Sequence, residues 1–158
     1  LQTCKEHGAD EVLLYPSGKM DRDQQKKLSD DIKELTNGQG ADVVYDPVGG
    51  DYAEPALRAT AWEGRYLVVG FAAGDIPKIP LNLALLKGCQ IVGVFWGAFK
   101  GREVEAHNAN VDELLKLYGD GHLKPHISSI YSLEEGSKAI SDLAERKARG
   151  KVIVQVRA

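Results

Sequence analysis

Residues 40–50 read GADVVYDPVGG, and this stretch decides the fold. Val43–Tyr45 is a short apolar run, and Pro47 and the glycine pair Gly49–Gly50 end it. An uninterrupted apolar run of this length, closed by turn residues, is typical of a strand that is buried on both faces. The stretch therefore predicts a buried strand that leads into a glycine-rich loop.

The same pattern continues on both sides of this stretch. Further apolar runs predict strands over residues 12–15, 66–71 and 91–96, and helical spacing predicts helices over residues 21–36, 51–60, 81–86 and 102–118. Strands that are apolar on both faces and alternate with helices favour a parallel sheet covered by helices. We therefore predict an open α/β fold, in which the carboxyl ends of the strands meet at one edge of the sheet.

The last part of the chain departs from this alternation. Residues 127–131 and 151–156 have the character of strands, and residues 133–146 have that of a helix. Ser132 and Glu135 have the spacing of a capping box, which predicts the start of this helix.

Composition and charge exclude several classes of protein. The chain has 158 residues and a formal net charge of −3, so no excess of positive charge favours nucleic acid or an anionic membrane. No apolar stretch approaches the ~20 residues that span a bilayer. Cys4 and Cys89 lack a CxxC partner and predict neither a disulfide framework nor a zinc site. We expect an intracellular protein, cytoplasmic or mitochondrial, and, because the sequence begins at Leu1, a part of a longer chain.

Glycines gather at the predicted carboxyl ends of the strands, in residues 46–50, 70–74 and 95–97. In an open parallel sheet, ligands bind at these ends, and glycine lets a ligand approach the backbone closely. The alternative, that glycine only permits the turn, stays open at this point. The phosphate-binding fingerprint GxGxxG, the Walker motif GxxxxGK[ST] and the hydrolase motif GxSxG are all absent from the sequence.

Several segments resemble the medium-chain dehydrogenases/reductases, in the same order along the chain. Besides residues 40–50, they are HGADEVLLY (residues 7–15), GRYLVVGF (residues 64–71) and GKVIV (residues 150–154). The resemblance covers essentially the whole chain, and it is closest in the zinc-free quinone oxidoreductase (zeta-crystallin) branch.

This resemblance implies a Rossmann-type sheet with flanking helices that binds NADP(H). Residues 1–122 would form part of the dinucleotide-binding domain, without the first strands and the phosphate-binding turn, which lie upstream in the family. Residues 123–158 would belong to the substrate domain. In the family, hydride passes directly from the nicotinamide to a quinone or an enone. The resemblance therefore implies an oxidoreductase in which this part of the chain supplies neither a metal ligand nor a catalytic side chain.

The resemblance also implies a set of cofactor contacts. The predicted contact residues are Tyr15, Val48, Gly70, Phe71, Ala72, Phe95, Trp96, Gly97 and Arg146. Tyr15 would lie beside the adenine and its 2′-phosphate, which Arg146 would also reach. Residues 70–72 would lie near the nicotinamide ribose, and residues 95–97 near the carboxamide. Phe95 and Trp96 suit core or interface aromatic residues equally well.

The family forms homodimers through the strand that corresponds to Ile91–Trp96, so a homodimer is expected here. Two other hypotheses stay open. The chain could be a non-catalytic Rossmann-like structural or dimerisation module, or an enoyl-reductase module of a larger synthase. The sequence does not identify the substrate, and it does not choose between NADP and NAD, because the discriminating residue ends a strand that lies upstream.

Overall fold

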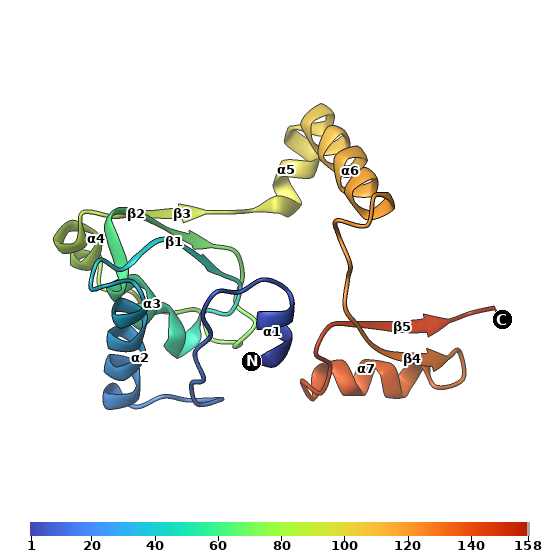
Figure 1. Ribbon diagram of the computed structural model, residues 1–158, viewed down its shortest axis with the longest axis horizontal. Helices are drawn as coiled ribbons and strands as arrows, with labels where there is room; N and C mark the ends of the chain where they lie inside the picture. The colour runs from blue at the N-terminus through green and yellow to red at the C-terminus, as the bar shows by residue number, and fades with distance from the viewer. Residues whose placement is uncertain (158) are drawn as a thin grey trace. The chain divides into compact units, whose positions relative to one another are not determined.

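The structure is a computed structural model that describes residues 1–157 (Figure 1). The chain divides into two compact units, Leu1–Trp96 and Gly97–Ala158, called the first and the second unit below. The first unit contains α1 (Gln2–Glu6), α2 (Arg22–Leu35), β1 (Ala41–Asp46), the 3-10 helix η1 (Gly50–Tyr52), α3 (Ala53–Arg58), β2 (Thr60–Val68), α4 (Asn82–Lys87) and β3 (Gln90–Gly93). The elements that follow are α5 (Trp96–Arg102), α6 (Val104–Gly119), β4 (Ile127–Ser132), α7 (Gly136–Ala144) and β5 (Lys151–Gln155).

The first unit is built on a parallel sheet with the strand order β1-β2-β3. Val44 of β1 pairs with Tyr66 of β2, which in turn pairs with Ile91 of β3. All three strands run in the same direction, so their carboxyl ends, at Asp46, Val68 and Gly93, lie at one edge. The predicted α/β fold with parallel strands and flanking helices is therefore confirmed.

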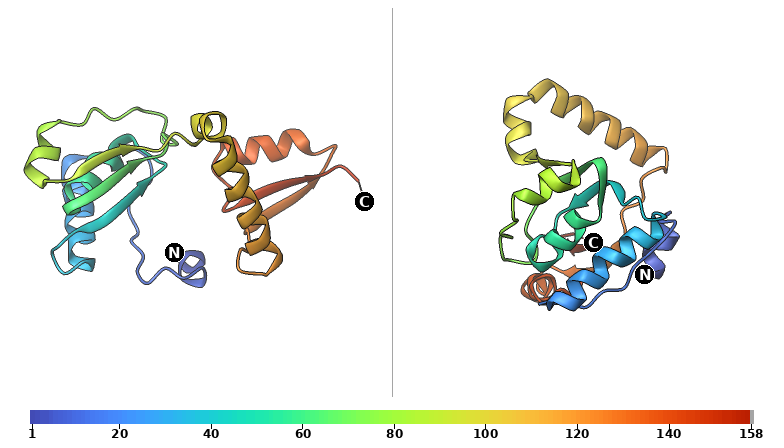
Figure 2. Two further views of the ribbon diagram at one scale, coloured as in Figure 1. Left: turned by 90° about the horizontal axis from the view of Figure 1, so that it is seen from above. Right: turned by 90° about the vertical axis from the view of Figure 1, so that its left-hand side faces the viewer.

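The core of the first unit lies between the sheet and the helices that follow β1 and β2. Helices α3 and α4 contact the sheet, and α2 packs on α3 (Figure 2). The buried side chains between these layers are Ala53, Leu57, Tyr66 and Leu83. Because side chains alternate across a strand, Tyr66 and its neighbours Val44 and Val68 face this core together.

The structure corrects the prediction for residues 12–15, which form no strand. Leu14 is 82% exposed, and the sheet of the first unit holds only β1, β2 and β3 within the described residues. An apolar run becomes a strand only where a neighbouring strand accepts and donates its backbone hydrogen bonds. Residues 12–15 have no such neighbour.

Two other strands are shorter or shifted relative to their predicted bounds. A strand was expected over residues 66–71, but β2 begins at Thr60 and ends at Val68. The strand expected over residues 91–96 ends at Gly93, and Trp96 begins α5. Beyond Val68 the backbone leaves the sheet: Val69 and Gly70 still bond to Asp46, but Ala72 and Ala73 bond to the loop after β1.

The second unit holds a two-stranded parallel sheet of β4 and β5, with α7 against both strands. Tyr131 of β4 donates a hydrogen bond to the carboxylate of Asp142 on α7. The expected capping box forms only in part: the backbone N–H of Ser132 donates to the Glu135 carboxylate over 3.4 Å, but α7 begins at Gly136 without a side-chain cap. Ser132 is the last residue of β4, so its backbone is part of the strand and Ser132 does not cap α7.

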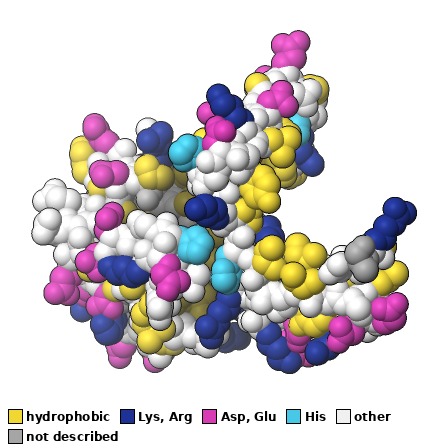
Figure 3. Space-filling model, turned by 45° about the vertical axis from the view of Figure 1, so that its right-hand side comes forward, with side chains coloured by type: hydrophobic (Ala, Val, Ile, Leu, Met, Phe, Trp, Pro, Cys, Tyr) yellow, Lys and Arg dark blue, Asp and Glu magenta, His cyan; other side chains and the backbone are white. Residues whose placement is uncertain are grey.

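Large hydrophobic side chains are exposed in both units, and Figure 3 shows them between charged groups. Among the described residues 1–157, no helix is long and apolar enough to pass through a lipid bilayer.

Candidate functional site

The loops that follow β1 and β2 are joined to each other by their backbones. The carbonyl of Asp46 accepts hydrogen bonds from the N–H groups of Val69 (3.0 Å) and Gly70 (3.3 Å). Further along, Ala72 N–H donates to the Pro47 carbonyl (3.1 Å), and Ala73 N–H donates to the Val48 carbonyl (2.8 Å). Residues 46–50 and 69–74, called the paired loops below, therefore form one continuous surface at the carboxyl edge of the sheet.

Glycine is required where the paired loops meet. Gly49 has φ 66° and ψ −144°, and a Cβ atom there would lie 2.9 Å from the Cδ1 atom of Phe71. A Cβ atom on Gly70 would lie 3.2 Å from the Pro47 carbonyl oxygen, and one on Gly50 would lie 2.8 Å from the Ala73 Cβ. Any side chain at Gly49 would also strain the backbone. These glycines let the two loops approach each other, whatever ligand the loops hold.

A buried carboxylate holds the base of the paired loops. Asp46 Oδ1 accepts hydrogen bonds from the N–H groups of Val48 (2.8 Å) and Gly49 (2.9 Å). Its other oxygen, Oδ2, accepts a hydrogen bond from the hydroxyl of Tyr66, whose side chain is only 3% exposed. Burial raises the pKa of Tyr66 far above its usual value, and the hydrogen bond to Asp46 raises it further. Tyr66 therefore stays protonated and acts as a donor at neutral pH.

Sequence reasoning missed the pairing of Asp46 with Tyr66. An aspartate at a strand end followed by Pro and Gly is a signal for a turn held by the side chain, and that signal is present in Asp46–Gly50. The tyrosine lies 20 residues away in the sequence, and no local pattern points to it.

Tyr15 lies next to the paired loops although it is not in a strand. Its ring packs against that of Tyr52 at a centroid distance of 5.2 Å, and Tyr52 is the last residue of η1, which begins at Gly50. The Tyr52 hydroxyl donates to the carbonyls of Pro16 (3.0 Å) and Gly18 (3.1 Å), which ties the segment after Tyr15 to the same region. Tyr15 remains 47% exposed, so part of its ring is available to a ligand.

The other predicted contact residues fall into three groups. Val48, Gly70, Phe71 and Ala72 belong to the paired loops, and the Phe71 ring is partly exposed. Phe95 and Trp96 follow β3 in the first unit, and both side chains are more than half exposed. Gly97 and Arg146 belong to the second unit, so their contact with a cofactor of the first unit stays a prediction.

The described residues suit the bases and riboses of a dinucleotide better than its pyrophosphate. Exposed aromatic rings at this edge offer flat surfaces on which a base can stack. A pyrophosphate needs several free backbone N–H groups, typically at a helix N-terminus. In the paired loops, the N–H groups of Val48, Gly49, Gly70, Ala72 and Ala73 already donate within the protein.

At least two cavities adjoin the paired loops. The smaller, of about 160 Å³, is lined in part by Asp46, Tyr66 and Phe71. The larger, of about 420 Å³, is lined in part by Gly50, Ile76, Lys78 and the carboxylates of Asp51, Glu54 and Asp75. This excess of negative charge disfavours a phosphate and is compatible with neutral hydroxyl groups.

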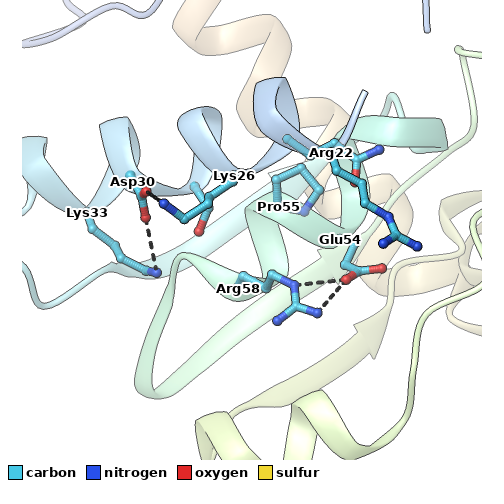
Figure 4. A pocket seen from close by; sticks show the side chains of 9 residues that line it. Arg22, Lys26, Asp30, Lys33, Glu54, Pro55 and Arg58 are labelled. Atoms are coloured by element: carbon cyan, nitrogen blue, oxygen red, sulfur yellow. Dashed lines mark hydrogen bonds and ion pairs between the residues drawn. The ribbon is translucent and has the colours of Figure 1, made fainter. Parts of the chain in front are cut away.

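A further cavity, of about 630 Å³, lies between α2 and α3 (Figure 4). Its charged side chains are largely paired with each other: Arg58 binds Glu54 at 2.6 Å, and Lys26 lies 3.5 Å from Asp30. Because these charges satisfy one another and no residue of the paired loops lines this cavity, we do not assign the candidate site to it. Among residues 1–157, no cluster of three or more His, Cys, Asp or Glu side chains could hold a metal ion.

The chain is similar to known proteins along its whole length. The sequence model of the zinc-binding dehydrogenase family matches residues 7–154. Quinone oxidoreductase-like protein 2 homolog from Nematostella vectensis is 38% identical over 133 residues, which is 84% of this chain and 36% of that protein. Quinone oxidoreductase-like protein 2 from Bos taurus is 33% identical over 156 residues, which is 99% of this chain and 42% of that protein.

Solved structures show the same relationship. A mycobacterial quinone oxidoreductase matches with a TM-score of 0.79 at 26% identity, over 98% of this chain and 45% of that one. A mycobacterial protein solved in complex with NADPH matches with a TM-score of 0.83 at 25% identity, over 98% of this chain and 46% of that one. The chain thus spans less than half the length of these relatives. With a family model that covers nearly all of it, the chain belongs to the zinc-binding dehydrogenase family of the medium-chain dehydrogenases/reductases and is similar to quinone oxidoreductase-like protein 2.

Proposed function

We propose that this chain is the C-terminal, cofactor-facing part of an NADPH-dependent oxidoreductase that reduces quinones or enones. The observation that carries the proposal is the parallel order of β1, β2 and β3, which brings the glycine-bearing loops after β1 and β2 to one edge of the sheet. The contact of Tyr15 with Tyr52, just after the first of these loops, supports it. The relatives named quinone oxidoreductase and the NADPH-bound neighbour support the reaction class and the cofactor.

In this proposal, the first unit orients the cofactor. Tyr15 stacks near the adenine, and the paired loops support the ribose of the nicotinamide, with Phe95 and Trp96 near its carboxamide. When bound, the nicotinamide would supply a hydride to the substrate, and a proton from water would complete the reduction. The protein contributes mainly position and orientation. Val48, beside Gly49 in the paired loops, adds apolar contact area for the cofactor.

The proposal is tested by titrating NADPH against two proteins. One is this chain, and the other is a longer chain extended upstream through the first strands and the phosphate-binding turn of the family. We expect the longer chain to bind NADPH at least about tenfold more tightly, because the pyrophosphate anchor contributes a large share of the binding energy. Equal affinity of the two proteins would contradict this division of the cofactor site. NADH in place of NADPH measures the preference for the 2′-phosphate.

The longer chain should also oxidise NADPH in the presence of a quinone. A non-catalytic module is the second candidate, favoured by the exposed edge of β3. It predicts no turnover and no shift of the melting temperature with NADPH, whereas the enzyme predicts a shift of several degrees through binding to the folded state.

We further propose that the edge of β3 forms a homodimer. Within the described residues, β3 pairs with β2 on one side only. Val94 N–H donates to the Val68 carbonyl (2.9 Å), so by strand alternation the N–H of Gly93 points away from β2. A free edge of this kind pairs readily with another strand.

The substitution Gly93→Pro tests the dimer, because proline removes only the outward-pointing donor and is tolerated on edge strands. We expect it to shift the protein from dimer to monomer in light scattering, while Gly93→Ala, which meets open space, leaves the dimer intact. A Gly93→Pro variant that remains dimeric would exclude this edge as the interface.

A further inference from the structure

We propose that Asp46 and Tyr66 are positioning residues that hold the paired loops in the geometry the cofactor needs, an inference that rests on the proposed function. Neither residue is among the predicted cofactor contacts, and both are buried. They act on the cofactor through the loops that they hold.

Asp46 is the point at which three segments of the first unit are tied together. Its carboxylate accepts the N–H groups of Val48 and Gly49 and the hydroxyl of Tyr66, and its backbone carbonyl accepts the N–H groups of Val69 and Gly70. The end of β1, the loop after it and the loop after β2 thus share one buried residue. A displacement of this carboxylate moves both loops.

Tyr66 fixes the orientation of that carboxylate from inside the core. Its ring packs with Leu57 and Leu83, and its hydroxyl reaches Asp46 Oδ2. With the hydroxyl removed, Oδ2 would remain in a buried place without this donor. The carboxylate would then turn toward water or toward other donors, at the expense of its bonds to Val48 and Gly49.

The paired loops carry this effect to the candidate site. The bonds Ala72 N–H to Pro47 and Ala73 N–H to Val48 make the loop after β2 follow the loop after β1. Residues 70–72 are those proposed to support the nicotinamide ribose. A shift of about 1 Å at this place is enough to lower the fraction of productively bound cofactor.

The chain offers a matched control for the substitution Tyr66→Phe. Tyr131 also donates its hydroxyl to a carboxylate, that of Asp142, but both residues belong to the second unit. The variant Tyr131→Phe therefore removes the same chemical group and the same kind of hydrogen bond without touching the paired loops.

Two measurements test the proposal. In this chain, hydrogen exchange of the amides of residues 48–49 and 69–73 reports how firmly the loops are held. In the longer chain extended upstream, the dissociation constant of NADPH and the KM for NADPH report the position of the cofactor. We expect Tyr66→Phe to speed exchange at these amides and to weaken NADPH binding by about tenfold each, with kcat at saturating NADPH changed much less. We expect Tyr131→Phe to change neither.

A double-substitution cycle adds a second route that does not depend on one variant. If Asp46 and Tyr66 act as a pair, Asp46→Asn combined with Tyr66→Phe weakens NADPH binding no more than Asp46→Asn alone. Additive effects would show that the two residues act separately, and would overturn the proposal.

The proposal would also be overturned if Tyr66→Phe lowered the melting temperature but left NADPH affinity and loop exchange unchanged, since the role of Tyr66 would then be purely structural. Failure of the unsubstituted longer chain to bind NADPH would instead refute the proposed function, and loop exchange in this chain would still show whether Tyr66 holds the loops.

Discussion

At the scale of single residues, glycine at a strand end has a reason that does not involve a ligand. Gly49 and Gly70 lie where two backbones approach each other, and a Cβ atom on either would meet the other loop. The nearby N–H groups are engaged by Asp46 and by loop carbonyls. Any ligand at this edge is therefore held mainly by side chains and by the shape of the paired loops.

The first prediction concerns Gly49. Its φ of 66° and ψ of −144° are open essentially to glycine alone, and the added Cβ would also press on Phe71. We expect Gly49→Ala to lower the free energy of unfolding by about 1–3 kcal/mol, measured by urea denaturation. Gly74→Ala is the control, because Gly74 has φ 99° but open space around its Cβ position, so it isolates the backbone strain from the contact. Equal losses in the two variants would show that the contact with Phe71 contributes nothing.

The second prediction is a dependence on alkaline pH. Burial, assisted by Asp46, raises the pKa of Tyr66 in the folded state above its usual value of 10.0. Above pH 10 the unfolded chain loses the Tyr66 proton while the folded chain keeps it, so the folded state binds more protons and its stability falls as pH rises. The contribution is complete below pH 10 and is lost above it.

Melting temperatures between pH 8 and pH 11 would check this prediction. The test is the difference between the unsubstituted protein and Tyr66→Phe, because this difference isolates the contribution of the Tyr66 hydroxyl. We expect Tyr66→Phe to be less stable at pH 8 and to lose less stability between pH 10 and pH 11. Parallel curves for the two proteins would contradict the assignment of the alkaline loss to Tyr66.

At the scale of elements, the sequence predicted those strands that have neighbours in the sheet. The apolar runs at residues 43–45, 66–71 and 91–96 each correspond to a strand, and all three are parallel as expected. The equally apolar run at residues 12–15 does not form a strand, because pattern alone does not supply a hydrogen-bonding partner. The end of β2 was misplaced by a few residues because bonds to the loop after β1 replace the ladder there, and such bonds join segments more than 20 residues apart.

The candidate site shows the same division between local and long-range signals. Sequence reasoning expected the glycine-bearing loops after β1 and β2 at one edge because parallel strands share their carboxyl edge, and the structure joins these two loops. It placed Tyr15 there as the end of a strand that does not form, and Tyr15 instead packs against Tyr52. It missed Tyr52 and Tyr66. The Tyr52 hydroxyl bonds to Pro16 and Gly18, which are 36 and 34 positions away in the sequence, and the Tyr66 hydroxyl bonds to Asp46, which is 20 positions away. Contacts of this kind depend on packing, which a single sequence does not reveal.

The third prediction concerns the start of α2. Asp21 accepts a hydrogen bond from Gln24 N–H (2.8 Å), and the Gln24 side chain accepts one from Asp21 N–H (3.0 Å), which completes a capping box. Replacement by alanine leaves backbone donors of the first turn without partners. We expect Asp21→Ala to lower the free energy of unfolding by about 1 kcal/mol, measured by urea denaturation. Asp23→Ala, in the same first turn but outside the cap, should lower it by less. A larger loss for Asp23→Ala would show that charge near the helix end matters more than the cap.

At the scale of the whole molecule, the two units differ in how much of their surface they bury. The first unit buries Leu57, Tyr66 and Leu83 between its sheet and its helices. In the second unit, Ala139 is the one hydrophobic side chain among the described residues that is buried to the same degree. Its strand and helix surfaces carry exposed Ile130, Ile140 and Leu143, and Leu133 in the turn between them is exposed as well. Burial of apolar area is the main source of folding free energy, so the units are expected to differ in stability.

The fourth prediction follows from this difference. Backbone amides exchange their protons when a region opens locally, and the free energy of opening rises with the apolar surface that the region buries. The strand β2 has a neighbour on each side and a packed face, whereas β4 and β5 form a two-stranded sheet, which is marginal by itself. We therefore expect the amides of β2 to exchange at least about tenfold more slowly than those of β4 and β5, a difference of roughly 1.4 kcal/mol in opening free energy. Exchange measured by mass spectrometry at neutral pH, and corrected for the intrinsic rates of the unfolded chain, would provide the comparison. Protection of β4 and β5 equal to that of β2 would contradict the prediction, and would mean that the exposed apolar residues of the second unit are covered in solution.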